Sequence, residues 1–247
     1  MKMIKSKKEI DSIRESGKIV SYVLKKLAEE CKEGITPLQI DSICRNLIEK
    51  ENATPACLNY FGFPASICIS VNEIAIHGIP TSTPFKNGDL VKLDLVVNKN
   101  GYLADSAITI GIGNLSEKAS QLKEVTKKCL YSSIYKIKPG LSTVDLVKPI
   151  KEITNKYGYG IIKEYCGHGI GTEMHEEPYI VHDPDYAIDF ILKSGMVICV
   201  EPMITEGLPD VKVLNDKWSV STLDNSLAAH FEHTVLVTDN GYEVLTL

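Results

Sequence analysis

The chain has 247 residues, a length that allows one large domain with a substantial buried core. Charged residues make up 24% of the chain and the formal net charge is −5, a balance that argues against a dominant nucleic-acid-binding surface. No apolar run approaches the length of a membrane-spanning helix, and no signal-peptide pattern occurs. Seven cysteines without a CxxC pair indicate reduced thiols in a cytoplasmic protein rather than a disulfide framework.

Two amphipathic helices are predicted at the start of the chain. Apolar residues recur at helical spacing over residues 7–31, which favours one buried stripe. Residues 36–39, Thr-Pro-Leu-Gln, combine an N-cap, a proline at the first helical position and a capping-box glutamine. A second helix is therefore expected over residues 37–50.

β-structure is predicted for the next segment. Residues 55–63 are rich in small and aromatic side chains, and a β-like run follows over residues 66–80. Strands are expected at residues 88–97 and 103–112, with a turn at residues 98–102 between them. The two strands and their turn form a hairpin.

The second half of the chain repeats this alternation. Amphipathic helices are predicted over residues 117–137 and 143–157. A glycine-rich stretch occupies residues 166–178. Strands are predicted over residues 196–203 and 230–237, and a short strand at the C-terminal end. Helices that alternate with hairpins, without a dividing linker, indicate an α+β domain.

Two pairs of segments within the chain resemble each other. KEGITPLQID at residues 32–41 resembles KPGLSTVDLV at residues 138–147, and both lie between two predicted helices. KNGDLVKLD at residues 86–94 resembles KSGMVICVE at residues 193–201. The offsets are 106 residues (138 − 32) and 107 residues (193 − 86), so the two pairs agree.

This internal repeat divides a single domain into two similar halves, roughly residues 1–112 and 113–247. In the alignment of the halves, Asp94 corresponds to Glu201. A carboxylate at the same place in both halves is difficult to explain by core packing, because burying an unpaired charge is costly. The repeat therefore points to a functional role for the two carboxylates.

The first hairpin brings two carboxylates to one face. Residues 100–101, Asn-Gly, predict a two-residue type I′ turn. This turn places Asp94 opposite Ala107. It also places Asp105 opposite Val96, so both carboxylates lie on the same face at a Cα separation of roughly 7–8 Å. A bound cation would relieve their mutual repulsion and the cost of their burial.

Glu201 and Glu232 form a similar pair in the second half, although the long connection between their strands leaves the register open. Together with His168, the chain offers four carboxylates and one imidazole. Such an oxygen-rich set suits Mn, Fe, Co or Zn ions rather than a thiolate zinc site. Five ligands are enough for two metal ions about 3.5–4 Å apart, and the absence of HExxH argues against a zincin. Cys199, two residues before Glu201, is interpreted as a packing thiol.

The glycine-rich stretch at residues 166–178, CGHGIGTEMHEEP, contains His168 and His175. Imidazoles in such a bend suggest metal ligation or proton transfer, and the alternative is a turn that carries surface histidines. Seven residues apart, the two side chains would lie on opposite faces of a regular strand. The glycines allow the backbone to bend, so we expect both imidazoles to reach the same site.

Six segments, namely IHGIP, LDL, GYLADSAIT, CGHGIGTEMHEEP, EPM and EHT, resemble the signature blocks of type I methionine aminopeptidases in their short, bacterial form. The resemblance covers essentially the whole chain. It implies a pita-bread fold, in which antiparallel β-hairpins of two pseudo-symmetric halves line a central dinuclear metal site and helices pack outside. It also implies hydrolysis that removes the N-terminal methionine from nascent proteins and peptides with a small second residue, by attack of a metal-bridging water or hydroxide.

The resemblance assigns roles to individual residues. The metal ligands would be Asp94, Asp105, His168, Glu201 and Glu232. Asp105 and Glu232 would bridge two divalent ions, for which the resemblance leaves Co, Mn, Fe, Zn and Ni as candidates. His77 would contact the scissile amide, His175 would stabilise the carbonyl oxygen as charge develops, and Glu201 would shuttle the proton. The methionine pocket would be formed by Cys57, Tyr60, Phe63, Cys68, Met174 and Trp218.

Four positions depart from the commonest family pattern. Phe61 and Phe63 stand where many members carry a histidine and a tyrosine. Met174 replaces a frequent phenylalanine, and His230 replaces a frequent glutamine. These departures bear on the shape of the pocket. For all the methionine-pocket residues, a packing role in the core is the alternative, because cysteine, methionine and aromatic side chains commonly fill cores.

Two other functions share parts of this pattern. Proline-specific peptidases and creatinase-like enzymes have similar blocks, but they usually carry a large additional N-terminal domain. Non-enzymatic relatives of the same fold tend to have lost ligands, whereas this sequence keeps all five. The resemblance further implies a monomer that acts on nascent polypeptides near the ribosomal exit tunnel, without a membrane or a specific nucleic-acid site.

Overall fold

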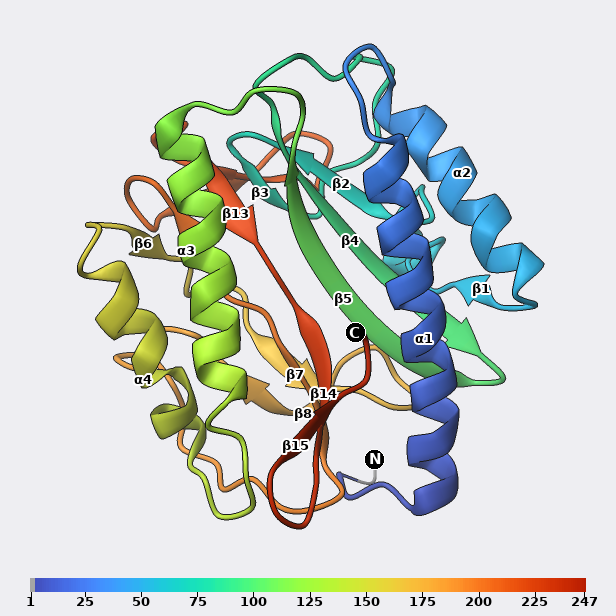
Figure 1. Cartoon of the computed structure of the whole chain (residues 1–247), viewed down its shortest axis with the longest axis vertical. Helices are drawn as coiled ribbons and strands as arrows, with labels where there is room; N and C mark the ends of the chain where they lie inside the picture. Colours follow the sequence, from blue (N-terminus) through green and yellow to red (C-terminus); the bar gives the residue numbers. More distant parts are fainter. Residues whose placement is uncertain (1–2) are drawn as a thin grey trace.

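Helices in two pairs flank the strands of the molecule (Figure 1). The computed structural model describes residues 3–247. The helices are α1 (Lys7–Glu30), α2 (Pro37–Lys50), α3 (Glu117–Ile134) and α4 (Thr143–Thr154), with a short 3₁₀-helix η1 (Tyr60–Gly62). The pair α1–α2 and the pair α3–α4 lie on opposite sides of the view, with strands between and behind them. None of the helices in the described range is both long enough and apolar enough to cross a membrane.

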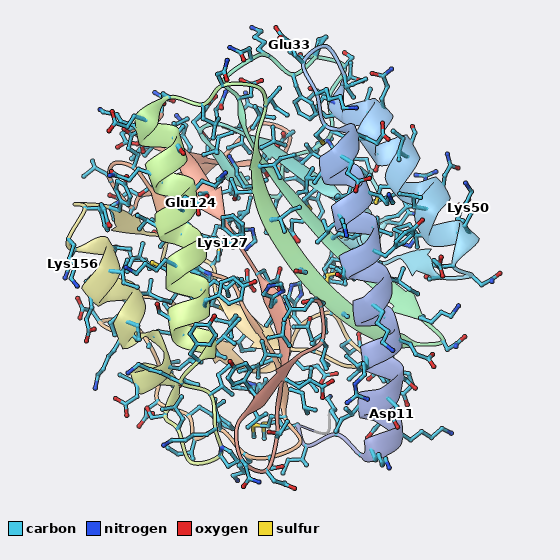
Figure 2. All side chains as sticks on the ribbon, in the orientation of Figure 1. Asp11, Glu33, Lys50, Glu124, Lys127 and Lys156 are labelled. Carbon is cyan, nitrogen blue, oxygen red and sulfur yellow. The ribbon has the colours of Figure 1, made fainter. Side chains whose placement is uncertain are left out.

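Side-chain caps fix where the helices begin. Thr36 and Gln39 form the predicted capping box at α2. Ser6 and Glu9 form another at α1. Charged side chains of both signs cover the outer surface of the helices and their connections (Figure 2), as the labelled residues show: Asp11, Glu33, Lys50, Glu124, Lys127 and Lys156.

Within residues 3–247 the strands form four antiparallel sheets. The first contains β1 (Thr54–Pro55), β2 (Cys68–Val71), β4 (Leu90–Lys99) and β5 (Tyr102–Gly111). The second is ordered β15–β14–β9–β7–β8 and contains β7 (Gly167–Gly169), β8 (Glu176–Ile180), β9 (Val197–Val200), β14 (His233–Val237) and β15 (Tyr242–Val244). Two three-stranded sheets are ordered β13–β10–β6 and β11–β12–β3. They contain β3 (Ile74–Ile76), β6 (Gly160–Ile161), β10 (Met203–Thr205), β11 (Val211–Val213), β12 (Val220–Thr222) and β13 (Ala228–His230).

Two strands that the sequence predicts as continuous are interrupted, which corrects the prediction. Residues 196–203 divide into β9 and β10 at Pro202, which has no amide hydrogen to donate to a ladder. Residues 230–237 divide into β13 and β14 around Glu232. Since β9 pairs with β14 and β10 pairs with β13, both segments pass from one sheet to another at this point. Glu201 and Glu232 therefore lie next to each other at the end of the β9–β14 ladder.

Two hydrophobic clusters fill the space between helices and sheets. One packs α1 and α2 against one face of β4, where Val91, Leu93, Leu95 and Val97 are fully buried. The other packs α3 and α4 against β9 and β14. Truncating one fully buried leucine such as Leu93 to alanine typically costs about 2–5 kcal/mol. Because the helices pack on this face of the hairpin, Asp94 lies on the opposite face.

Candidate active site

The β4–β5 hairpin has the register that its turn predicts. The turn residues at 100–101 have φ angles of 55° and 85°, as a type I′ turn requires. Asp94 pairs with Ala107. Asp105 pairs with Val96, so both carboxylates lie on the face opposite to the side chains that pack on α1.

A cavity of about 300 Å³ opens on this face of the hairpin. Its walls come from both the β4–β5 hairpin and the five-stranded sheet. All the side chains assigned above from the sequence line it: Cys57, Tyr60, Phe63, Cys68, His77, Asp94, Asp105, His168, Met174, His175, Glu201, Trp218 and Glu232. Residues that are far apart in the sequence thus converge on one place.

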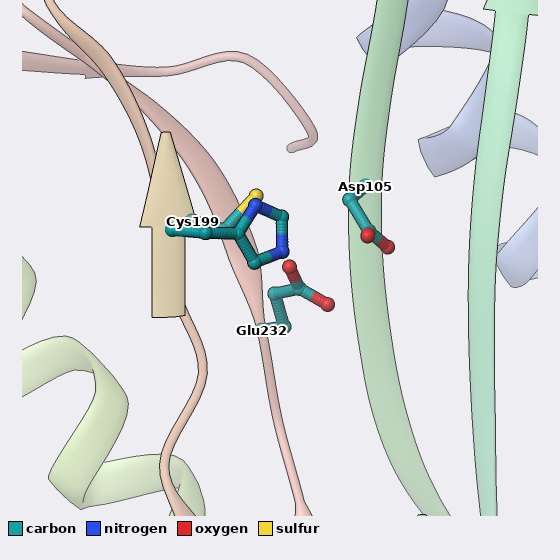
Figure 3. Close-up of side chains that lie close together, drawn as sticks. Asp105, Cys199 and Glu232 are labelled. Atoms are coloured by element: carbon teal, nitrogen blue, oxygen red, sulfur yellow. The ribbon is translucent and has the colours of Figure 1, made fainter. Parts of the chain in front are cut away.

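Four side chains that could bind a metal ion cluster here: Asp105, His168, Cys199 and Glu232. One potential ligand atom from each lies within 4.8 Å of the others, and all four residues are buried. In Figure 3, the carboxylates of Asp105 and Glu232 point into the space between β5 and the strands opposite. Donors from both halves of the chain therefore meet in one group.

Glu201 lies just outside this group, beside three imidazoles. Its Oε1 is 3.4 Å from Nε2 of His168, and its Oε2 is 3.6 Å from Nε2 of His230. The backbone N–H of Glu201 donates to Nε2 of His182 at 3.0 Å. The carboxylate is therefore held between two histidine rings while a third fixes its backbone.

The carboxylates of the site are crowded and withdrawn from solvent, which raises their pKa values; Asp105 and Glu232 are buried, and Asp94 and Glu201 are half-buried. Burial is the largest cause for Asp105 and Glu232, and the negative charges of neighbouring carboxylates add to it. Burial is also the main reason that the pKa values of Asp94 and Glu201 are raised. Oδ1 of Asp105 and Oε1 of Glu232 find no hydrogen-bond partner within the described residues. A bound cation would satisfy these oxygens, so the donor set fits divalent metal ions.

His168 presents a neutral imidazole to the carboxylates. Its pKa is lowered to about 3, first by burial and then by the neighbouring His175. Nδ1 lies 2.9 Å from the carbonyl oxygen of Gly169, which can only accept, so Nδ1 carries the ring proton. Nε2 keeps a free lone pair, and this is the form of histidine that binds metal ions.

Cys199 belongs to the closest group of donors but is poorly suited to ligation. Its pKa is raised well above the usual value by burial and by the charges of Glu232 and Asp105. Its sulfur also lies 3.6 Å from Oγ1 of Thr234. The thiolate is the form of cysteine that binds metal ions, and a raised pKa favours the protonated thiol. Cys199 is therefore a thiol that packs beside the site, in agreement with its interpretation from the sequence.

His175 reaches the cavity through a hairpin. Strands β7 and β8 are antiparallel, with Gly169 opposite Glu176. His175, just before β8, therefore faces His168 on β7, and the two ring centroids are 4.4 Å apart. The prediction that the two imidazoles meet is confirmed, but a hairpin rather than a bend within one strand brings them together. The hydroxyl of Tyr60 lies 2.9 Å from Nδ1 of His175.

His77 follows β3 and adopts a φ angle of 56°. Burial lowers its pKa to about 4, with further contributions from His230 and His175. Its ring packs edge-on against Tyr165, with centroids 5.4 Å apart. The imidazole is therefore neutral at physiological pH and held by an aromatic neighbour.

Sulfur and aromatic side chains form much of the remaining cavity wall. Four of them are buried: Cys57, Phe63, Cys68 and Met174. Phe63 packs edge-on against Trp218, with ring centroids 5.2 Å apart. The wall is apolar and polarisable, which suits a flexible thioether side chain.

The departures from the family pattern fall into two groups. Phe63 and Met174 line the cavity and can shape it. Phe61 is 85% exposed and lies outside the cavity lining, so it does not define the pocket. His230 also lies outside the lining and is buried against Glu201.

The sequence profile of metallopeptidase family M24 matches residues 11–239. The chain belongs to this family. Methionine aminopeptidases of Buchnera aphidicola subsp. Baizongia pistaciae and Escherichia coli (strain K12) are 44% and 36% identical, and each match covers 99% of this chain and 93% of the relative. The methionine aminopeptidase of Clostridium acetobutylicum is 42% identical, and the match covers 100% of this chain and 99% of the relative. Within family M24, the chain therefore belongs with the methionine aminopeptidases.

Solved structures of this family share the fold. The methionine aminopeptidase from Rickettsia prowazekii matches with a TM-score of 0.96 and 37% identity, over 100% of both chains. That from Thermotoga maritima matches with a TM-score of 0.96 and 36% identity, over 100% of this chain and 99% of its own. The prolidase from Pyrococcus furiosus has a TM-score of 0.80 and 27% identity, and the match covers 99% of this chain but 65% of the prolidase. The predicted α+β pita-bread fold is confirmed.

Several residues that were not assigned to the cavity from the sequence of this M24 chain also line it: Ile76, Val96, Glu164, Tyr165, Cys166 and Tyr179. Strand alternation could have found Val96, which is two residues from Asp94 on the same face. No sequence signal marks His182, and the departure from the family pattern at His230 does not indicate its contact with Glu201. Both reach Glu201 only because the folded chain brings separate segments together.

Proposed function

We propose that this chain is a metal-dependent aminopeptidase that removes the N-terminal methionine from proteins and peptides with a small second residue. One observation carries this function: four carboxylates and a neutral imidazole line the same cavity as a wall of sulfur and aromatic side chains. The name methionine aminopeptidase, which relatives similar over almost the whole chain carry, supports the same reaction.

In this proposal, two divalent ions would be held by Asp94, Asp105, His168, Glu201 and Glu232. An oxygen of Asp105 and one of Glu232 have no hydrogen-bond partner among residues 3–247, which supports their role as ligands. The donor set suits Co, Mn, Fe, Zn or Ni. Such ions, when bound, supply a Lewis acid that lowers the pKa of a water molecule and a contact for the free α-amine of the substrate.

Three side chains handle protons and charge around the scissile bond. Glu201, whose carboxylate lies beside His168 and His230, would accept the proton of the attacking water and pass it to the leaving amine. The hydroxyl of Tyr60 lies 2.9 Å from Nδ1 of His175. In the tautomer in which Nδ1 accepts from this hydroxyl, the Nε2–H group donates to the carbonyl oxygen as it gains charge. His77, kept neutral by burial, contacts the scissile amide.

The side chain of the substrate methionine occupies the wall formed by Cys57, Tyr60, Phe63, Cys68, Met174 and Trp218. Sulfur and aromatic groups attract a thioether by dispersion and by sulfur–aromatic contact. The edge-on packing of Phe63 on Trp218 gives this wall a fixed shape. The cavity volume of about 300 Å³ lies at the lower end of the range for small-ligand pockets.

The proposal extends to where and how the chain acts. It is a single catalytic domain with halves at residues 1–112 and 113–247, and it works as a monomer on nascent polypeptides near the ribosomal exit tunnel in the cytoplasm. The seven cysteines are all free, which is typical of a reducing compartment. The repeated segments connect α1 to α2 and α3 to α4. Light scattering and co-sedimentation with ribosomes test the monomer and the ribosome contact.

A peptide assay tests the reaction. Metal-loaded protein is incubated with Met-Ala-Ser and, separately, with an X-Pro-containing peptide, and the products are identified by mass spectrometry. We expect free methionine from the first peptide, none in the presence of EDTA, and no cleavage of the second. Preference for the X-Pro peptide would favour a prolidase-like enzyme. Cleavage of neither peptide would refute both enzyme functions and favour a binding module.

A further inference from the structure

A buried ion pair lies directly behind the turn that carries His175. The ammonium group of Lys5 contacts Oε2 of Glu176, and the two side chains are only 6% and 2% exposed. Neither residue lines the cavity. Glu176 follows His175 in the chain, so the ion pair is one residue away from a side chain that is proposed to act on the substrate.

The carboxylate of Glu176 fixes the turn that precedes His175. Its Oε1 accepts the backbone N–H of Thr172 at 3.1 Å and that of Glu173 at 3.3 Å. Its Oε2 is satisfied by Lys5. Each oxygen of this buried carboxylate therefore has its own donor, and the backbone just before Met174 is tied to it.

Lys5 is itself fixed by a distant part of the chain. Its backbone N–H donates to the carbonyl oxygen of Gly195 at 2.8 Å, and Ile4 forms an antiparallel bridge with Met196. A Cβ at Gly171 would lie 2.5 Å from the ammonium nitrogen of Lys5, so glycine leaves the room that the ion pair occupies. The segment thus joins the start of β9 to the turn between β7 and β8.

We propose that Lys5 is a positioning residue for His175 and acts through Glu176. The inference rests on the proposed role of His175 toward the scissile carbonyl. With the ammonium in place, Glu176 holds the turn so that Met174 and His175 both line the cavity. Without it, the buried carboxylate loses its counter-ion, which is costly, and the turn moves to bring Glu176 toward water. The imidazole of His175 then leaves its place.

The first test removes the charge. Lys5→Met keeps the apolar length of the side chain, and Lys7→Met, at an exposed lysine two positions along, is the matched control. We expect Lys5→Met to lower kcat for Met-Ala-Ser by roughly 10- to 100-fold, as for a misplaced catalytic group. Metal affinity measured by calorimetry should not change, and Lys7→Met should behave as wild type. Unchanged kcat in Lys5→Met, or a parallel loss of metal, would overturn the inference.

A double-mutant cycle separates positioning from a general effect on stability. In a His175→Ala background, Lys5→Met should have little further effect on kcat, because the group that it positions is gone. An equal fold-loss in both backgrounds would overturn the inference. Hydrogen exchange of the Thr172 and Glu173 amides gives a readout without activity. It should accelerate in Lys5→Met, and unchanged protection would also contradict the proposal.

Two further arms keep the proposal testable. Lys5→Gln keeps a donor to the carboxylate of Glu176, and it replaces Lys5→Met if that variant does not fold. We expect its kcat to lie between those of wild type and Lys5→Met. A wild-type kcat together with a wild-type exchange rate would contradict the role of the Lys5 charge in holding the turn. If the wild-type protein releases no methionine, the proposed function fails, while the exchange measurement still decides whether Lys5 holds the turn.

Discussion

Asp105 and Glu232 each have a buried carboxylate oxygen without a hydrogen-bond partner among the described residues. Burial and the charges of neighbouring carboxylates raise the pKa values of both residues. A raised carboxyl pKa means that the folded state holds its proton more tightly than the unfolded chain. This contribution to stability is present at low pH and is lost as the pH rises through the folded-state pKa. A bound divalent ion reverses the effect, because it stabilises the ionised carboxylates.

Neutralising one of these carboxylates should therefore have opposite effects with and without metal. We expect Glu232→Gln to raise the unfolding free energy of the metal-free protein at pH 8.5 by roughly 1–3 kcal/mol, because it removes a buried charge that has no counter-ion within the described part of the chain. It should also abolish the stabilisation that added Mn gives. Urea unfolding in EDTA and in Mn measures both effects. Glu33→Gln, at an exposed position, is the control, and a normal response of Glu232→Gln to Mn would contradict the assignment.

His175 should affect the rate rather than the metal. We expect His175→Ala to lower kcat by roughly 100- to 1000-fold, because it removes a donor from the developing oxyanion. Metal content, measured by atomic emission, should stay at the wild-type value. Tyr60→Phe, which removes only the partner of Nδ1, should have a smaller effect on kcat. Equal losses of rate and bound metal in His175→Ala would indicate a structural role instead.

The elements of the site differ in how far the sequence determines them. The register of the β4–β5 hairpin follows from a local turn and from strand alternation, so the positions of Asp94 and Asp105 are predictable. The pairing of β9 with β14 closes a long connection, and tertiary packing sets its register. The breaks beside Glu201 and Glu232, and the hairpin that returns His175, depend on contacts between distant segments. The sequence therefore predicts which residues meet, but not the backbone paths that bring them together.

The β4–β5 turn offers a test at the scale of this element. Gly101 has a φ angle of 85°, and no atom lies close to where a Cβ would be. An alanine at this position would therefore be destabilised by its backbone conformation and not by a steric clash. We expect Gly101→Ala to lower the unfolding free energy by about 1–2 kcal/mol, with little change in kcat of the metal-loaded enzyme, because the flanking strands keep the register. Gly241→Ala, which also meets open space but lacks a positive φ angle, is the control. A loss of stability as large in Gly241→Ala would contradict this account.

At the scale of the whole molecule, the site is assembled from both parts of the chain. Asp94 and Asp105 come from the first sheet, whereas His168 comes from the five-stranded sheet. Glu201 and Glu232 stand where segments cross from that sheet to a three-stranded one. The centre of the molecule is consequently rich in buried titratable groups, and its stability should depend on pH.

Five of the six histidines have pKa values lowered to about 3 or 4 and are neutral near physiological pH: His77, His168, His182, His230 and His233. Four of them are buried, and His77 is half-buried. Between the unfolded value of 6.5 and these lowered values, the unfolded chain binds more protons than the folded one. Stability therefore rises with pH across this window and is lost on acidification.

Metal-loaded protein should show this dependence most clearly, because the ions keep the carboxylates ionised in the folded state. We expect its unfolding free energy to fall steadily as the pH is lowered from about 6.5 to about 4.5. The metal-free protein should show a shallower slope, since its carboxylates contribute with the opposite sign. Urea unfolding at a series of pH values compares the two, and a pH-independent stability of the metal-loaded protein would contradict the burial of neutral histidines.

The proposed site would hold two metal ions between the two halves of the chain. Anomalous diffraction from a crystal soaked in Mn tests it most directly. We expect two peaks about 3.5–4 Å apart in the cavity, each within coordination distance of both Asp105 and Glu232. A single peak that lacks one of these carboxylates, or peaks elsewhere in the molecule, would contradict it.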